Sequence, residues 1–223
     1  MIHAVIFDLF ETLVTELNVP VRRAGSLASE LGVDAAAYKR EWRSRRPEIV
    51  LGHYSFRDAL IQITSSLGGI ADEAVFEGLR AERVAQKATV LGRVEPEVLT
   101  TLSELRRRGM KLGLITNSFA EDVQEWERSP LRSFFDAAVF SCAAGLLKPN
   151  PAIYAAACKE VKVIPQEALF VGDGGDDELA GARSAGLATA RALWFASKWP
   201  NTMIGPGESG LWRIGQVLDV LGA

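Results

Sequence analysis

The chain has 223 residues, of which 48% are hydrophobic and 24% charged, enough for one core domain with an inserted subdomain. Its formal net charge is −3, so we expect no nucleic-acid partner. No run of about 18 apolar residues occurs, and the first apolar stretch ends at Asp8, so we expect no signal peptide, no membrane span and a cytoplasmic protein.

Five short apolar runs are predicted to form buried parallel strands, at residues 2–7, 111–115, 137–140, 168–171 and 187–192. Helical repeats between or after them begin near residues 98, 151, 179 and 211, and the Gly-, Pro- and Ser-rich residues 197–210 are predicted to form a long loop. Strands that alternate with helices indicate an α/β fold with a doubly wound parallel sheet covered on both faces.

Residues 15–88 have a different pattern, because they contain helical repeats without a convincing strand. The repeats cover residues 21–31, 35–46, 56–67 and 71–85, separated by glycines. An all-α block between the first and second strands indicates an inserted subdomain. We therefore predict an α/β core of residues 1–14 plus 89–223 and a helical cap of residues 15–88.

Polar side chains follow the predicted strands. Asp8 comes after the first strand, Thr116 and Asn117 after the second, Lys148 before the helix that begins at residue 151, and an acidic cluster at 173–178 after the fourth. Ligands of doubly wound sheets bind beyond the carboxyl ends of the strands. We therefore expect these groups to form one site.

This set of side chains suits a small anionic substrate. The carboxylate of Asp8 can attack phosphorus or carbon and form a covalent intermediate. Thr116 can hold phosphoryl oxygens, and Lys148 can neutralise charge that develops in the transition state. Asp8 and the 173–178 cluster together can hold Mg²⁺, which prefers oxygen ligands. Without a cation or the lysine, carboxylates this close would raise one another's pKa.

Four segments, in order, resemble the motifs of the haloacid dehalogenase-like (HAD) hydrolase superfamily: I-F-D-L-F-E-T-L at 6–13, L-I-T-N-S at 114–118, G-L-L-K-P-N-P-A-I-Y at 145–154 and F-V-G-D-G-G-D-D-E-L-A-G-A at 170–182. The resemblance spans the whole chain. It implies a Rossmann-like core, with the helical insert as a first-type cap, and hydrolase activity.

The resemblance also implies roles for individual residues. Asp8 is expected to be the nucleophile and Thr116 the hydroxyl that binds phosphate. Asn117, beside it, is expected to contact substrate. Lys148 is expected to steady both the nucleophile and the intermediate, and to contact substrate.

The metal ligands implied by the resemblance are Asp8, Asp173, one further acidic residue and the backbone carbonyl of Phe10. Asp177 and Glu178 both stand near the further acidic position, and the spacing G-D-x-x-x-x-E-L-x-G-A favours Glu178. Mg²⁺ is the expected cofactor.

Phe10 complicates the expected reaction. Phosphatases of this family usually carry Asp at this position as the acid for the leaving alcohol, and such acids contribute about 10²–10⁴-fold. Glu11 replaces the usual glycine and is an uncertain substitute, because its direction is not set by the sequence. Three alternatives therefore stay open: a Mg²⁺-dependent phosphohydrolase acting on a small phosphorylated metabolite, a metal-independent 2-haloacid dehalogenase, and a weakly active or regulatory binding protein.

The acidic cluster at 173–178 favours the phosphohydrolase, since the dehalogenase counterpart resembles S-S-N-x-x-D. Phe10 favours the dehalogenase, whose relatives carry an aromatic residue there and release halide without a proton. Arg43, Arg45 and Arg46 are expected to form a solvated helix face, and Asp176 to be a surface charge. The cap has no diagnostic motif, so the substrate stays open, as does the choice between monomer and homodimer.

Overall fold

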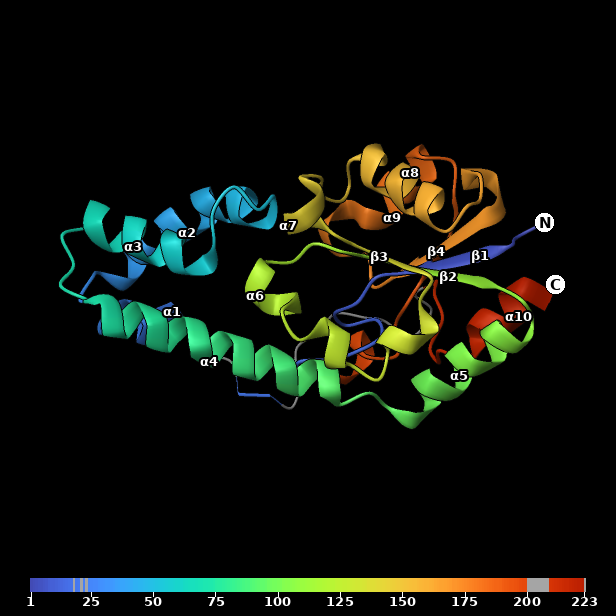
Figure 1. Cartoon of the computed structure of the whole chain (residues 1–223), viewed down its shortest axis with the longest axis horizontal. Helices are drawn as coiled ribbons and strands as arrows, with labels where there is room; N and C mark the ends of the chain where they lie inside the picture. The colour runs from blue at the N-terminus through green and yellow to red at the C-terminus, as the bar shows by residue number, and fades with distance from the viewer. Residues whose placement is uncertain (18, 21, 23, 200–208, 223) are drawn as a thin grey trace.

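The computed structural model describes residues 1–223 except 18, 21, 23, 200–208 and 223. At its centre is a five-stranded parallel sheet in the order β3-β2-β1-β4-β5, drawn in Figure 1. The five predicted strands are confirmed to within two residues at either end. They are β1 (Ala4–Phe7), β2 (Lys111–Thr116), β3 (Ala137–Phe140), β4 (Ala168–Gly172) and β5 (Ala188–Arg191).

Helices cover both faces of this sheet (Figure 1). In β1, Val5 and Phe7 belong to a core shared with α5 and α10, while Ala4 and Ile6 belong to a second core shared with α8 and α9. This alternation follows from the two-residue period of a strand, and it explains why every β1 side chain is apolar. The core helices are α5 (Pro96–Arg107), α6 (Ala120–Val123), α7 (Ser141–Ala144), α8 (Pro151–Glu160), α9 (Glu178–Ser184) and α10 (Gln216–Gly222).

Four further helices lie beyond the end of the sheet that is opposite the chain termini (Figure 1). They have their own apolar core, which Phe119 and Leu147 of the α/β part join. Their order matches the four predicted helical repeats. They are α1 (Ala24–Glu30), α2 (Ala35–Val50), α3 (Phe56–Ser66) and α4 (Glu73–Gly92). The cap limits of 15 and 88 remain predictions, and residue 88 falls inside α4.

Local capping explains where three cap helices begin. Asp34 accepts a hydrogen bond from the N–H of Ala37 at the start of α2, and Asp72 caps α4 in the same way. Ser55 and Asp58 form a reciprocal capping box at the start of α3. These caps satisfy backbone N–H groups that lack partners within the helix.

The C-terminal segment differs from the prediction. A helix was expected from residue 211, but α10 begins at Gln216, because Leu211 forms a parallel bridge with Ala192. Trp212, next to this bridge, is 40% exposed. Most of the predicted loop 197–210 lies outside the described residues. Among the helices that the structure describes, none combines the length and apolar character needed to cross a membrane.

Candidate active site

The predicted site residues meet at the carboxyl ends of the central strands. Asp8 follows β1, Thr116 ends β2, Asp173 follows β4, and Lys148 lies between α7 and α8. The backbone N–H of Asp8 donates to the carbonyl of Val171 at 2.8 Å, which ties the loop after β1 to β4. Asp8 and Thr116 are buried, with exposed fractions of 6% and 1%.

The ammonium of Lys148 lies between two carboxylates. Its Nζ donates to Asp8 Oδ1 at 2.5 Å and to Glu178 Oε2 at 2.5 Å. Burial alone would lower the pKa of Lys148, but the charges of Asp8 and Glu178 outweigh burial and raise it. Lys148 is therefore a permanent cation beside Asp8.

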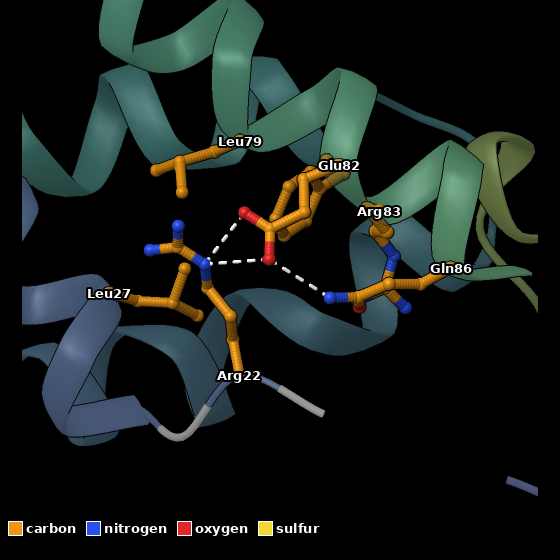
Figure 2. Close-up of a pocket in the computed structure, with 7 residues that line it drawn as sticks. Arg22, Leu27, Leu79, Glu82, Arg83 and Gln86 are labelled. Carbon is orange, nitrogen blue, oxygen red and sulfur yellow. Dashed lines mark hydrogen bonds and ion pairs between the residues drawn. The ribbon is translucent and has the colours of Figure 1, made fainter. Parts of the chain in front are cut away.

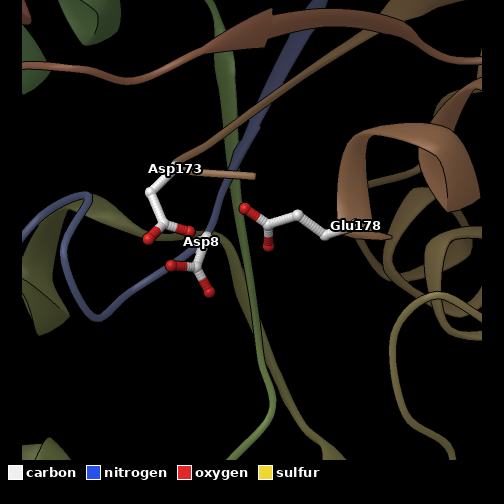
Figure 3. A group of neighbouring side chains, drawn as sticks. All are labelled: Asp8, Asp173 and Glu178. Atoms are coloured by element: carbon white, nitrogen blue, oxygen red, sulfur yellow. The ribbon is translucent and has the colours of Figure 1, made fainter. Parts of the chain in front are cut away.

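Asp8, Asp173 and Glu178 form a cluster of carboxylates (Figure 3). Each offers an oxygen, and these oxygens all lie within 4.8 Å of one another. Glu178 also accepts a hydrogen bond from the N–H of Gly174 at 3.0 Å, and a Cβ on Gly172 would collide with its carboxylate. Asp177 is exposed and lies outside this cluster. Hard oxygen donors of this kind suit Mg²⁺.

Burial raises the pKa of two carboxylates of this cluster. Burial, more than any charge, raises the pKa of Asp8, although Lys148 lowers it in part. Burial together with the charge of Asp8 raises the pKa of Glu178 to about 8. A divalent cation bound here would favour the ionised form of all three carboxylates, whose charge together with the ammonium of Lys148 would balance it.

The side-chain amide of Asn117 forms hydrogen bonds with Lys148 and Asp176. Its Nδ2 donates to the carbonyl of Lys148 at 3.0 Å and to Asp176 Oδ2 at 3.0 Å, and its Oδ1 accepts from the N–H of Lys148 at 2.9 Å. The side chain of Asn117, which was expected to contact substrate, thus forms hydrogen bonds with both backbone polar groups of Lys148.

Comparison with known proteins identifies the family. The family model for haloacid dehalogenase-like hydrolase matches residues 2–186. The chain belongs to the haloacid dehalogenase-like hydrolases. The resemblance drawn from the four motifs is thereby confirmed, as are the fold class and the assignment as a hydrolase.

Relatives of this hydrolase include both phosphatases and dehalogenases. It is 33% identical over 199 residues to a glyceraldehyde 3-phosphate phosphatase from Methanopyrus kandleri, covering 86% of this chain and 84% of that one. It is 27% identical over 200 residues to (S)-2-haloacid dehalogenase 4A from Burkholderia cepacia, covering 85% and 82%. The crystal structure of a 2-haloacid dehalogenase from Pseudomonas syringae pv. tomato superposes with a TM-score of 0.68 at 25% identity, covering 100% and 99%.

Glu11 of the hydrolase is fixed by its backbone conformation and by hydrogen bonds to its carboxylate. Its backbone adopts a left-handed conformation with φ of 60°, a region that favours glycine. Its carboxylate accepts hydrogen bonds from the hydroxyl of Thr15 at 2.8 Å, the N–H of Glu16 at 2.8 Å and Nε1 of Trp199 at 2.6 Å. These three donors hold the carboxylate in place within the described part of the chain.

Phe10 meets the cap. Nζ of Lys87, on α4, lies 4.0 Å from the centroid of the Phe10 ring, which is a cation–π contact. Lys87 also pairs with Glu16. The aromatic side chain of Phe10 thus packs against a cation of the cap helix α4.

Sequence reasoning assigned no role to Thr12. Its side chain is fully buried, and its Oγ1 has no hydrogen-bond partner within the described part of the chain. A buried hydroxyl without a partner is costly, and this one lies in the loop that begins at Asp8. Its fixed place in the first motif was the signal that could have singled it out.

A pocket inside the cap is not part of this site (Figure 2). Its volume is about 60 Å³, and all of its lining residues belong to the predicted cap. Arg22 and Glu82 form an ion pair across it at 2.7 Å. The remaining lining residues are Leu27, Phe56, Leu79, Arg83 and Gln86.

Proposed function

We propose that this hydrolase is a Mg²⁺-dependent phosphohydrolase that uses Asp8 to cleave small phosphorylated metabolites. The observation that carries the proposal is the convergence of Asp8, Asp173 and Glu178, whose oxygens lie within 4.8 Å of one another beside the ammonium of Lys148. Buried charge of one sign is costly unless a cation compensates it. We propose Asp8, Asp173, Glu178 and the carbonyl of Phe10 as the protein ligands. A bound Mg²⁺ would neutralise charge on the phosphoryl oxygens.

The reaction follows from the placement of the side chains. A carboxylate oxygen of Asp8 forms a bond to phosphorus while the bond from phosphorus to the leaving oxygen breaks, which gives an aspartyl phosphate. Water then attacks phosphorus and loses a proton to solvent, the bond to Asp8 breaks, and phosphate leaves. Lys148 steadies Asp8 throughout and offsets developing charge. Thr116 is proposed to hold a phosphoryl oxygen.

The missing acid restricts the substrate. With Phe10 in place of an aspartate and Glu11 committed to Thr15, Glu16 and Trp199, the leaving oxygen must depart as an anion and take its proton from solvent. Acyl and aryl phosphates have leaving groups that are stable as anions. We therefore expect faster hydrolysis of these esters than of alkyl phosphates.

A dehalogenase is the second candidate, and Phe10 favours it. Halide leaves without a proton, so a site without an acid suits that reaction. In it, Asp8 would displace halide from carbon, and water would then hydrolyse the ester. The clustering of Asp173 and Glu178 with Asp8 argues against a dehalogenase, because a metal-independent reaction does not require three carboxylates at one site.

Assays on three substrates separate the two candidates. Phosphate release from p-nitrophenyl phosphate and acetyl phosphate, and chloride release from L-2-chloropropionate, are measured with Mg²⁺ and with EDTA. We expect phosphate release that EDTA and Asp8→Asn both abolish and that the matched control Asp177→Asn retains. Chloride release that persists in EDTA would overturn the phosphohydrolase in favour of the dehalogenase.

A further inference from the structure

The loop between Asp173 and Glu178 has an unusual backbone. Asp176 and Asp177 both adopt left-handed conformations, with φ of 50° and 54°. Residues other than glycine avoid this region and persist in it only when the surroundings hold them there. The two neighbours differ in one respect. The carboxylate of Asp176 has partners, whereas the side chain of Asp177 has no hydrogen bond or ion pair among the described residues.

The partners of Asp176 come from two parts of the molecule. Its Oδ2 accepts a hydrogen bond from Nδ2 of Asn117 at 3.0 Å. The same oxygen lies 3.9 Å from Nη2 of Arg46, on the cap helix α2. One carboxylate oxygen therefore faces both the loop after β2 and the cap.

Asn117 connects Asp176 to Lys148 through hydrogen bonds. Its amide both donates to the carbonyl of Lys148 and accepts from the N–H of Lys148, so the backbone of that residue is held at two points. The side chain of Lys148 ends between Asp8 and Glu178. A continuous series of polar contacts thus runs from Arg46 through Asp176 and Asn117 to Lys148.

A second contact places α2 against the core near this series. Gly52, which follows α2, lies so close to Cys142 that a Cβ would overlap with the Cys142 carbonyl. Gly52 also has a φ of 78°. The end of α2 is therefore packed against α7, which precedes Lys148 in the chain, and Arg46 reaches Asp176 from a cap that contacts the core.

We propose that Asn117 and Asp176 are positioning residues for Lys148, and that Arg46 makes this positioning depend on the seated cap. The catalytic consequence rests on the proposed role of Asp8 as nucleophile, because Lys148 acts on the reaction through Asp8. The role differs from substrate binding, in which Asn117 would contact the substrate directly. Charge on Arg46 orients Asp176, Asp176 orients the amide of Asn117, and that amide fixes the backbone from which the ammonium extends.

The test uses two readouts on the full-length protein. Hydrogen exchange of the Lys148 amide, followed by NMR, reports the positioning without any substrate. Steady-state hydrolysis of acetyl phosphate with Mg²⁺ reports its consequence. Asp176→Ala is compared with Asp177→Ala, which alters the same loop and the same backbone conformation without removing a described contact. Arg46→Gln is compared with Arg43→Gln, an exposed arginine of the same helix.

We expect Asp176→Ala to speed exchange at Lys148 and to lower kcat by about tenfold with KM unchanged, the effect of one hydrogen bond to the site. Asp176→Asn keeps an acceptor for Asn117 and should restore most of kcat. Arg46→Gln should lower kcat by about twofold, as fits an exposed pair, and should add nothing in the Asp176→Ala background. Both control variants should match the wild type.

Three results would overturn the proposal. The first is exchange at Lys148 that Asp176→Ala leaves at the wild-type rate. The second is a rise in KM with kcat unchanged, which would make the residue a substrate contact. The third is an Arg46→Gln loss that persists in full without Asp176. If acetyl phosphate is not hydrolysed, the proposed function fails, and the exchange measurement still decides whether Asp176 positions Lys148.

Discussion

Replacing Lys148 by methionine tests the electrostatics of the site most severely. The side chain is 3% exposed and lies 2.5 Å from both Asp8 and Glu178. Methionine keeps much of its volume and removes the charge, so three carboxylates then face one another without a cation. Removing one partner of a buried ion pair costs about 3–5 kcal/mol. For a chain of this size that lowers Tm by about 6–20 °C, at about 2–4 °C per kcal/mol.

The loss should depend on pH. Without Lys148, the burial that raises the pKa of Asp8 and of Glu178, the latter already at about 8, loses the main group that offsets it. A carboxyl whose pKa is higher in the folded state binds more protons there, so its destabilising effect is full above the folded pKa and fades as pH falls through it toward the ordinary value. The gap in unfolding free energy between variant and wild type should therefore narrow as pH falls through the further raised pKa values of Glu178 and Asp8 in the variant.

Urea and thermal unfolding of the metal-free protein measure this gap. Lys159→Met serves as the control, because Lys159 is an exposed lysine of α8, and it should change stability by less than about 0.5 kcal/mol. Mg²⁺ should stabilise Lys148→Met by more than it stabilises the wild type, since the variant site carries one more uncompensated negative charge. A Lys148→Met protein as stable as wild type at pH 8.5, or a gap that widens on acidification, would refute the charge argument.

Three other substitutions test separate parts of the site. Glu178→Gln should weaken Mg²⁺ binding by about tenfold or more, measured by calorimetry, whereas Asp177→Asn should leave it unchanged; equal effects would contradict Glu178 as the ligand. Glu11→Ala should lower the free energy of unfolding by about 1–3 kcal/mol through the donors it leaves unpaired, and loss of activity in a variant that remains folded would give Glu11 a chemical role. Phe10→Asp should raise kcat on alkyl phosphates by about tenfold or more; no gain would mean that the missing acid does not limit the enzyme.

The sequence predicted the sheet well because its central strands are buried on both faces. Ala4–Phe7 and Ala168–Gly172 are continuous apolar runs bounded by polar or glycine residues, and local composition is enough to recognise them. The segment after residue 210 was harder. Leu211 pairs with Ala192, and a pairing across the fold leaves no periodic signal, so the apolar repeat there was extended into a helix that begins later.

For the site, the order of the four motifs predicted which residues lie together at the carboxyl ends of the strands. The choice between Asp177 and Glu178 rested on spacing alone, and burial of Glu178 against Lys148 supports it. The hydrogen bonds of the Asn117 amide were not predictable, because its partners Lys148 and Asp176 are distant in the chain. The contact of Arg46 with Asp176 likewise depends on how the cap sits on the core, which no local pattern encodes.

Mass spectrometry of the acid-quenched protein tests the central claim most directly. The hydrolase is mixed with acetyl phosphate, with Mg²⁺ or with EDTA, quenched during turnover and digested. We predict that the peptide containing Asp8 gains the mass of one phosphoryl group, that the gain requires Mg²⁺, and that Asp8→Asn abolishes it. A phosphoryl group on another residue, or a 1-carboxyethyl ester on Asp8 formed from L-2-chloropropionate in EDTA, would contradict metal-assisted phosphoryl transfer to Asp8.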